Sequence, residues 1–498
     1  MITLALLLAM AVTALEQTVV STAMPSIISS LNGLEIYPWV FSAYLLAATV
    51  STPLYGKLAD LLGRKRVLLF GLFLFSLGSI LSGLSRSMPE LIVMRIVQGL
   101  GAGAVAPVVL TMLGDLFSMQ ERARVQGLFS AVWGVSSLAG PTLGGYLTDS
   151  MSWRAVFFVS VPFAAVAIWI LMAYVRETLG HREVLPIDWP GAALLAGGST
   201  LLLLGLLHGG SGGWTRTAGL IGLSLAFLVA FIRRELVAED PILPMDLMTT
   251  PTILAANVGS FVIGGLLFGL DTYIPLYVQG VRGGTASDAG LMVTPLFLSW
   301  SISVAVAARV AVRFGFRATA LVGSVLITLG MFAIAAGAQW PAWSKASFLG
   351  GMFIIGLGMG PTSLSYILGV QNVVPWGRRG VATGGVLFFR TVGGALSVAV
   401  LGASLGAGLT SRLAAGKAVG IDVSKALRPE THSLLPPDQL LAVQDALGQS
   451  LTMVFLEMCG LALLALVCSS RLIRGIGADP VTTDGHQPGA ESAMVLME

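Results

Sequence analysis

The sequence predicts an all-α, polytopic membrane protein whose fourteen transmembrane helices form two six-helix bundles with a two-helix insert. Three observations predict this fold: the scarcity of charge, the number of apolar segments and an internal repeat. Of the 498 residues, 55% are hydrophobic and 11% are charged, whereas soluble domains carry about 25% charged residues. So few charges cannot cover a water-soluble surface of this size, and we therefore expect the lipid bilayer to be a partner.

Composition also limits the class of function. The net charge of +3 gives no indication of a nucleic-acid partner. Cys459 and Cys468 fall in the last apolar segment and the four histidines are scattered, so we expect neither a disulfide nor a metal centre. No nucleotide-binding loop and no nucleophile–base set is recognisable. We therefore expect a protein that is not an enzyme and that needs no cofactor.

Fourteen segments approach the roughly 20 apolar residues that a membrane-spanning helix needs. The first has no basic region before it and no small-residue cleavage site, so it reads as a membrane helix and not as a signal peptide. The segments lie near residues 3–28, 38–57, 67–84, 89–116, 126–147, 153–175, 187–207, 216–233, 251–278, 287–310, 318–338, 346–373, 380–407 and 447–470.

The distribution of basic residues predicts the orientation. An even number of spans puts both termini on one side, where the loops hold seventeen lysines and arginines, against nine in the opposite loops. Because basic loops stay in the cytoplasm, we expect a cell-membrane protein with both termini cytoplasmic. The external loop 408–446 is long, with an amphipathic helix expected after Pro437, and offers a place for an envelope partner. The polar tail 475–498 is expected to be disordered.

An internal repeat predicts the domain organisation. The stretch that follows the second span, with Lys57 and Gly63, matches the stretch that follows the tenth, with Arg309 and Gly315. Likewise "GLGAG" at 99–103 matches "GLGMG" at 356–360. Such repeats are typical of secondary transporters, whose substrate site lies between the halves. We expect bundles at 1–175 and 251–474, with the insert and its linkers at 176–250 between them.

Four motifs identify a family resemblance. "LEQTVVSTAMPSI" (15–27), "GKLADLLGRKR" (56–66), "RIVQGLGAG" (95–103) and "GPTLGG" (140–145) occur in this order. They resemble the motifs of the major facilitator superfamily, in particular its fourteen-helix drug:proton antiporter branch, which includes multidrug and quaternary-ammonium exporters. The resemblance implies the major facilitator fold and a proton-coupled exporter of lipophilic, possibly cationic compounds. An exporter of a lipid, a siderophore or an endogenous metabolite is the alternative on the same fold.

Glu16 and Arg95 are the first candidates for proton coupling. An ionised acid at the bilayer centre costs roughly 2.5–3.5 kcal/mol by insertion scales, and low-dielectric surroundings favour the protonated form of a carboxyl group. Glu16 can therefore alternate between neutral and anionic forms, or it can be a structural acid in an ion pair. Arg95 keeps its charge, so it can only tune a neighbour. The resemblance implies a role for it in proton coupling, and a structural bond to backbone carbonyls is the alternative.

The resemblance implies two conformational elements. Asp60 and Arg64 stand one helical turn apart at the cytoplasmic mouth, where Gly56 lets a neighbouring helix approach. With Gly63 and with Asp115 at the end of the fourth span, they resemble the family's latch. On the fifth span, small residues at four-residue spacing allow close helix packing, and the proline bends the helix. The family role of this motif is a hinge, and its residues are Gly140, Pro141, Gly144 and Gly145.

Asp271 is the best second acid, because the ninth span lines the cavity in the family. It is a candidate for binding a proton or a cationic substrate, or else a solvated cap residue near the surface. Arg390 lies midway through its span and must have a partner. Apart from Asp288 at the very start of the tenth span, no acid occurs on the tenth or thirteenth span, which argues against recognition of divalent cationic drugs. The candidate lining of the substrate cavity comprises Gln98, Asp271, Tyr273, Phe388 and Arg390.

Overall fold

A computed structural model describes residues 1–116, 119–175, 188–208, 214–238, 241, 245–248, 250–340, 344–374, 379–415 and 436–472. Every regular element in these ranges is a helix, which confirms the predicted all-α class. The helices are α1 (Ile2–Leu31), α2 (Pro38–Leu62), α3 (Arg64–Leu84), α4 (Met88–Leu116), α5 (Met119–Ser150), α6 (Ala155–Phe158), α7 (Ser160–Tyr174), α8 (Trp189–His208), α9 (Trp214–Glu235), α10 (Met245–Met248), α11 (Pro251–Gly280), α12 (Ala286–Phe314), α13 (Phe316–Gln339), α14 (Ser344–Val373), α15 (Arg379–Ala415) and α16 (Pro437–Ser470).

Each of the fourteen predicted spans falls on helical structure. The sixth is divided at Val159 into α6 and α7, and every other span corresponds to one helix. Among the described residues, ten helices are both long and apolar enough to cross a bilayer. The chain is therefore a multi-pass membrane protein.

Two boundaries differ from the prediction. Helix α15 continues to Ala415 and α16 begins at Pro437, so both extend into the region predicted as an external loop. The helix expected after Pro437 is thus not a separate amphipathic helix but the first turns of α16. Proline at the first helical position has no amide hydrogen to leave unsatisfied, and no proline follows within α16 to interrupt it. Residues 416–435 and the tail 475–498 lie outside the described part of the chain.

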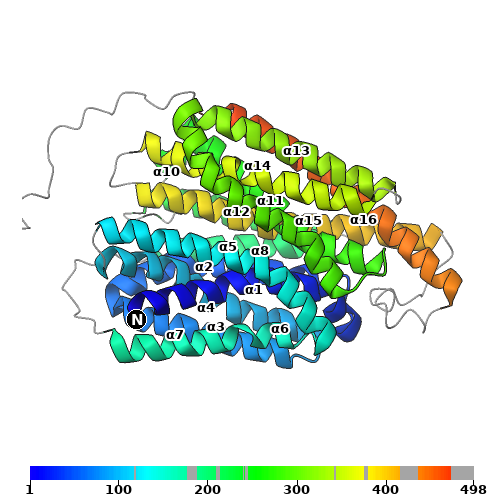
Figure 1. The fold of residues 1–498 in the computed structure, drawn as a ribbon, viewed down its shortest axis with the longest axis horizontal. Helices are drawn as coiled ribbons and strands as arrows, with labels where there is room; N and C mark the ends of the chain where they lie inside the picture. Colours follow the sequence, from blue (N-terminus) through cyan, green and yellow to red (C-terminus); the bar gives the residue numbers. More distant parts are fainter. Residues whose placement is uncertain are drawn as a thin grey trace, which may run out of the picture.

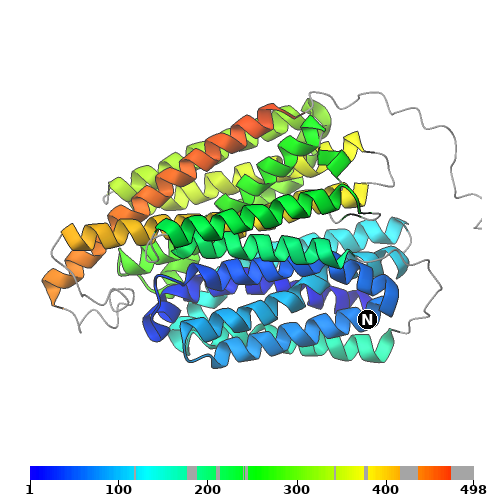
Figure 2. The ribbon, with the colours of Figure 1, turned by 180° about the vertical axis from the view of Figure 1, so that it is seen from behind.

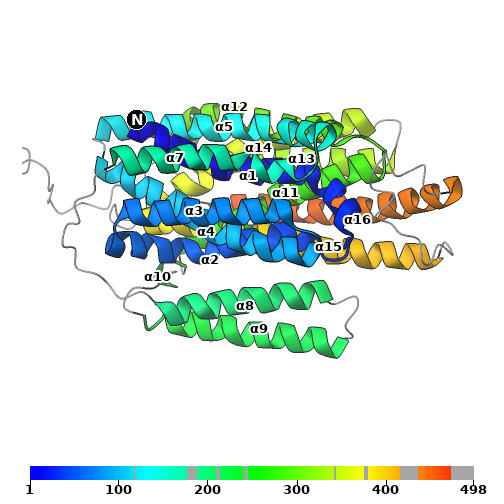
Figure 3. The ribbon, with the colours of Figure 1, turned by 90° about the horizontal axis from the view of Figure 1, so that it is seen from below.

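The helices before and after the insert form two groups. Helices α1–α7 lie together along one side, and α11–α16 along the other (Figures 1 and 2). Helices α8 and α9 pack as a hairpin outside both groups (Figure 3), where α8 contacts α2 and α15. Large apolar side chains on α9, among them Leu225 and Val229, are exposed, as expected for a face in contact with lipid. The domain boundaries themselves stay a prediction.

The matched segments of the internal repeat have matched structures. Gly63 ends α2 with φ +95°, and Gly315 ends α12 with φ +87°. These are left-handed conformations that favour glycine. In "GLGAG", the first and third glycines pack against α2 and the second against α3; in "GLGMG", the first and third pack against α12 and the second against α13. The same glycine pattern therefore brings three helices into close contact in each half.

Contacts between the two groups gather at the end where α1, α5 and α11 finish and α2 and α12 begin. There the Gln279 side chain donates to the Thr22 carbonyl oxygen at 3.0 Å, and the Thr142 and Thr294 hydroxyl groups lie 3.2 Å apart. The Ser42 hydroxyl donates to a carbonyl oxygen of α15 at 2.9 Å. In this structure the two groups are therefore joined at this end, which we call the sealed end.

Candidate functional site

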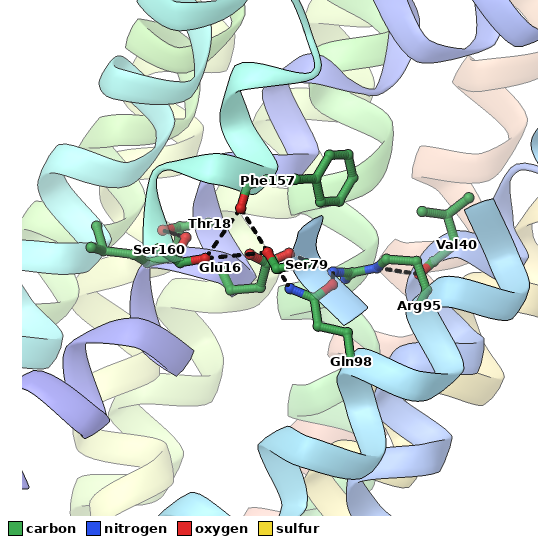
Figure 4. Close-up of polar contacts among 9 residues, drawn as sticks. Glu16, Thr18, Val40, Ser79, Arg95, Gln98, Phe157 and Ser160 are labelled. Carbon is green, nitrogen blue, oxygen red and sulfur yellow. Dashed lines mark hydrogen bonds and ion pairs between the residues drawn. The ribbon is translucent and has the colours of Figure 1, made fainter. Parts of the chain in front are cut away.

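Glu16 and Arg95 form a buried ion pair between α1 and α4 (Figure 4). Each residue is only 1% exposed. The guanidinium Nη1 of Arg95 donates to Oε1 of Glu16. The structure thus brings together the two residues for which the sequence predicts proton coupling.

Arg95 has contacts besides the carboxylate. Its Nε donates to the Val40 carbonyl oxygen at 3.1 Å, and Nη1 also donates to Oε1 of Gln98 at 2.7 Å. The guanidinium carbon lies 4.1 Å from the centre of the Tyr44 ring, within the range of a cation–π interaction. These neutral contacts orient the guanidinium and partly replace its hydration whether or not Glu16 is charged.

A chain of hydrogen bonds extends from the ion pair to α3 and α7 (Figure 4). The Gln98 amide donates to the Ser79 hydroxyl at 3.1 Å, and Ser79 donates to the Phe157 carbonyl oxygen at 2.6 Å. The Ser160 hydroxyl lies 3.3 Å from Ser79. Since a buried network specifies its geometry only when its members are satisfied, Gln98 serves here to position Arg95. The sequence singled out Gln98 as a cavity residue but missed both serines.

One oxygen of Glu16 is left over. Its Oε2 is buried and has no hydrogen-bond partner among the described residues, and the same holds for the Tyr44 hydroxyl. An ion pair with no net charge tolerates burial far better than a lone charge. A carboxyl group with one paired and one unpaired oxygen can accept a proton at the unpaired oxygen, and once neutral it requires no counter-charge from the arginine. The arrangement can therefore hold a proton at Glu16 Oε2.

Asp271 is not part of this pair. It lies on α11 and is 3% exposed, so the alternative of a solvated cap residue is wrong. Its Oδ1 has no hydrogen-bond partner in the described structure, and the neighbouring hydroxyl group is that of Ser21 on α1. Asp271 is therefore a second buried acid at the contact between the two groups of helices.

Of the remaining cavity candidates, Tyr273 is buried, whereas Phe388 and Arg390 are partly exposed. Tyr273 is fully buried, donates to the Val398 carbonyl oxygen at 2.6 Å and meets the Tyr37 ring edge-on at 6.4 Å. Phe388 packs against a small apolar cluster of the α8–α9 hairpin. Arg390 is half-buried, and no partner for its side chain occurs in the described residues. The expectation that Arg390 must have a partner is therefore wrong for this structure.

The glycine motif of α5 fits that helix between α1 and α12. A Cβ atom at Gly140 would collide with the Thr18 side chain, and one at Gly144 with the Val19 carbonyl oxygen. At Gly145 it would collide with the backbone at the start of α12, while the carbonyl of Pro141 faces Gly290 of α12. Pro141 lies inside a continuous α5. The predicted hinge motif thus packs α5 closely against α1 of its own half and against α12 of the other half, and its hinging role stays a prediction.

The predicted latch is described only in part. Gly63 separates α2 from α3, and Arg64 begins α3, but the side chains of Asp60 and Asp115 lie outside the described residues. Nothing among the described atoms lies within 4 Å of a Cβ built at Gly56. The close helix approach expected there is therefore not seen among the described atoms.

Sequence reasoning missed a different acid, Asp149 near the end of α5. Its carboxylate accepts hydrogen bonds from the backbone amides of Ala286 at 3.2 Å and Ser287 at 2.9 Å, the first two residues of α12. Two sequence features fit this contact once the start of α12 is known: Asp149 follows Gly145 by one helical turn, and α12 begins with a capping box of Thr285 and Asp288. Asp149 thus joins the two halves at the sealed end.

A second ion pair lies at the base of the hairpin. Arg234 of α9 donates through Nε to Oδ1 of Asp188 at 2.9 Å, and the same oxygen accepts from the Gly191 amide at 3.2 Å. Asp188 therefore caps α8 and ties it to α9. Elsewhere, in the part of the chain that is described, no group of three or more metal-binding side chains is placed to hold an ion.

Comparisons with known proteins give the family. Residues 6–398 match the model of the Major Facilitator Superfamily. The chain is 32% identical to multidrug resistance protein 3 of Bacillus subtilis (strain 168) over 497 residues, which cover 97% of this chain and 96% of that protein. It is 36% identical over 407 residues to the multidrug transporter protein MdtP of the same organism, covering 81% and 74%.

Solved structures agree with the fold. A bacterial homologue of the human lysosomal transporter Spinster, in an inward-facing and unoccupied conformation, aligns with a TM-score of 0.68 at 15% identity and covers 95% of this chain and 97% of its own. A D-xylose–proton symporter aligns with a TM-score of 0.60 at 13% identity, covering 92% and 96%. The motifs, the paired bundles and these matches agree: the chain belongs to the Major Facilitator Superfamily and is a membrane transporter, not an enzyme.

Proposed function

We propose that the protein is a proton-coupled secondary active transporter that exports lipophilic drugs or toxic compounds, cationic ones among them, by alternating access. The names of its bacterial relatives support drug export. The observation that carries the coupling is the buried Glu16–Arg95 pair with its unpartnered Glu16 Oε2. No cofactor enters the proposal, and the coupling ion is the proton.

The coupling follows from the contacts of the pair. A proton arriving at Glu16 Oε2 neutralises the carboxylate and weakens its attraction to Arg95. The guanidinium keeps its charge but still contacts the Val40 carbonyl oxygen, Gln98 and the Tyr44 ring. Because these contacts remain, the pair can open without leaving a bare buried cation. Loss of the proton restores the ion pair, and α1 and α4 draw together again.

The conformational step concerns the sealed end. With both termini on the cytoplasmic side of a cell membrane, as the basic loops indicate, the sealed end faces outward and the structure corresponds to an inward-facing state. The outward-facing state then requires the contacts of Asp149 with α12 and of Gln279 with α1 to break. The α5 glycines and the Gly56–Asp115 latch residues are the proposed pivot and inner lock of that motion.

Asp271 completes the proposed site. It is buried, its Oδ1 has no described partner, and it contacts α1, the helix that carries Glu16. A second proton or a cationic group of the cargo would supply the missing partner. Glu16 and Asp271 belong to opposite halves, so rocking of the bundles changes the surroundings of both acids.

The alternative keeps the transporter and changes its cargo to a lipid, a siderophore or an endogenous metabolite, with loop 408–446 docking an envelope partner. A resistance screen of expressing cells against a compound panel, together with lipid analysis, separates the two. Unaltered resistance with shifted lipid composition would remove drug export.

Coupling is tested in liposomes with purified protein and an imposed pH gradient. Wild-type protein should accumulate a fluorescent lipophilic substrate, and Glu16→Gln should abolish the gradient-driven part while substrate binding and thermal stability persist. Glu35→Gln is the matched control, because Glu35 is exposed between α1 and α2. Undiminished gradient-driven transport by Glu16→Gln would exclude Glu16 from coupling.

A further inference from the structure

Arg390 lies where α15 crosses α11 most closely. A Cβ atom at Gly264, near the middle of α11, would collide with the Arg390 backbone carbonyl, and one at Gly393 would collide with the carbonyl of Phe261. Arg390 is thus fixed deep in the membrane-spanning part of the chain by glycine contacts on both helices. Its backbone position is determined by packing that does not involve its side chain.

Among the described residues, no charged group pairs with the Arg390 guanidinium. Within the described residues no side chain or carbonyl oxygen lies at hydrogen-bond or ion-pair distance from it. Helix α15 contains no aspartate or glutamate, and α11 contains only Asp271, which lies seven residues, or about two helical turns, beyond Gly264. Of the other interior charges, Glu16 and Arg95 neutralise each other.

The side chain is also accessible. Every residue from Leu387 to Val392 is partly exposed, whichever face of α15 it occupies, whereas the following three residues, Gly393 to Ala395, are buried. The change comes at the point where α15 reaches α2, because the Ala395 carbonyl accepts the Ser42 hydroxyl at the sealed end. Arg390 therefore lies next to the sealed end, in a stretch of α15 that is partly exposed.

An unpaired cation at this depth is costly, and ionisable residues in membrane spans normally pair or face a functional site. An anionic group would supply the missing charge, and a planar carboxylate or sulfonate would match the two parallel donors of a guanidinium. Phe389 provides apolar surface in the same partly exposed stretch, and its ring meets edge-on, at 5.6 Å, that of Phe388, which packs against the α8–α9 hairpin. The surroundings of Arg390 thus suit an acid carried on a lipophilic body.

We propose that Arg390 binds the acidic group of a lipophilic organic anion, so that this class of compound is among the transported cargo. The proposal rests on the proposed transport function and specifies its substrate class. Arg390 is a specificity-determining residue here: it distinguishes an anion from a neutral or cationic molecule of the same size. Loss of its charge should remove that distinction and leave the apolar contacts intact.

The test uses three probes with one apolar body: pyrenebutanoate, its neutral methyl ester, and pyrenebutyl-trimethylammonium. Their binding to the purified full-length protein in detergent is measured by fluorescence anisotropy. Since hydrogen bonds to a charged partner change affinity by roughly 10- to 100-fold, wild-type protein should bind the anion at least about tenfold more tightly than the ester. Arg390→Gln should lower anion affinity to that of the ester, and Arg390→Lys should retain a preference for the anion.

Arg412→Gln is the matched control, because Arg412 is a partly exposed arginine of α15 that is already bonded to Gln449 and Ser450; it should leave all three affinities unchanged. Equal wild-type affinity for the three probes, or unaltered anion binding by Arg390→Gln, would overturn the proposal. The wild-type comparison decides it even where a variant fails to fold. An anion preference without gradient-driven transport of any probe would instead refute the proposed function and leave the anion site standing.

Discussion

The contact of Asp149 with α12 predicts how strongly the two halves are held together at the sealed end. The carboxylate accepts two backbone amides at the N-terminus of α12, where the helix dipole favours negative charge. Replacing a capping side chain with alanine typically costs about 1 kcal/mol. Because Asp149 contacts the other half only while this end is closed, the loss falls on the closed state alone.

A difference of about 1 kcal/mol changes the ratio of open to closed molecules by about fivefold. Asp149→Ala should therefore raise the open fraction about fivefold. Asp149→Asn should raise it less, since asparagine also caps helix N-termini but carries no charge.

The assay measures access to Thr22, which is buried at the sealed end. A cysteine at this position, in a variant lacking Cys459 and Cys468, is labelled by a membrane-impermeant maleimide added on the side of the sealed end only when that end opens. Its labelling rate should rise about fivefold with Asp149→Ala and stay constant with Asp438→Asn, an exposed acid in the first turn of α16. A labelling rate that Asp149→Ala leaves unchanged would refute the reasoning.

Two further predictions concern packing and charge. Arg95→Leu leaves the Glu16 carboxylate unpaired, and breaking a buried pair in this way costs about 3–5 kcal/mol. Thermal unfolding in detergent should therefore show a large loss of stability, and combining Arg95→Leu with Glu16→Gln should restore most of it. A double variant as unstable as Arg95→Leu alone would contradict this. Gly144→Ala places a methyl group against the Val19 carbonyl of α1 and should destabilise the packing of α5 on α1 by about 1–3 kcal/mol, whereas Gly219→Ala, with no described atom within 4 Å, should not. Equal effects of the two substitutions would show that the contact between α5 and α1 adjusts without cost.

Periodic and compositional features of the chain were predictable, because membrane solvation leaves few solutions. In lipid every backbone group must be satisfied within the helix, so each long apolar segment is helical. The glycines of the two matched motifs were likewise readable, since only glycine permits such close helix contact. The division of the sixth span at Val159 and the unbroken α16 were not readable, because they depend on how neighbouring helices pack.

The site was predictable in its charged members and not in its supporting ones. Glu16 and Arg95 are conspicuous because charges are rare in membrane spans. Ser79 and Ser160 are ordinary in such helices, where a hydroxyl usually bonds its own backbone, so no sequence signal distinguished the two that support Gln98. Asp149 was missed for another reason: an acid at a helix end looks like a solvated residue until its partner, the start of α12, is known.

The two halves share the glycine positions of the repeat but not the charged residues of the site. Counting back from the matched glycines, the residues of α14 that correspond to Arg95 and Gln98 are Met352 and Ile355, and both are fully buried and apolar. The ion pair therefore has no counterpart in the second half. What the second half offers instead is Asp271 and Arg390, so proton and cargo have their proposed sites mainly on opposite halves.

This separation makes the charge of the cargo decisive for the driving force. Exchange of one entering proton for one leaving monovalent cation moves no net charge, whereas exchange for a leaving anion moves two. Each charge gains about 2.3 kcal/mol per 100 mV, so export of an anion bound at Arg390 should respond to membrane potential at about 4.6 kcal/mol per 100 mV. In liposomes clamped by potassium and valinomycin, a potential positive on the side from which protons enter should accelerate exchange of pyrenebutanoate and leave that of pyrenebutyl-trimethylammonium unaffected. Equal responses to potential would mean that the two probes leave with different numbers of protons, and the one-proton cycle at Glu16 would have to be abandoned.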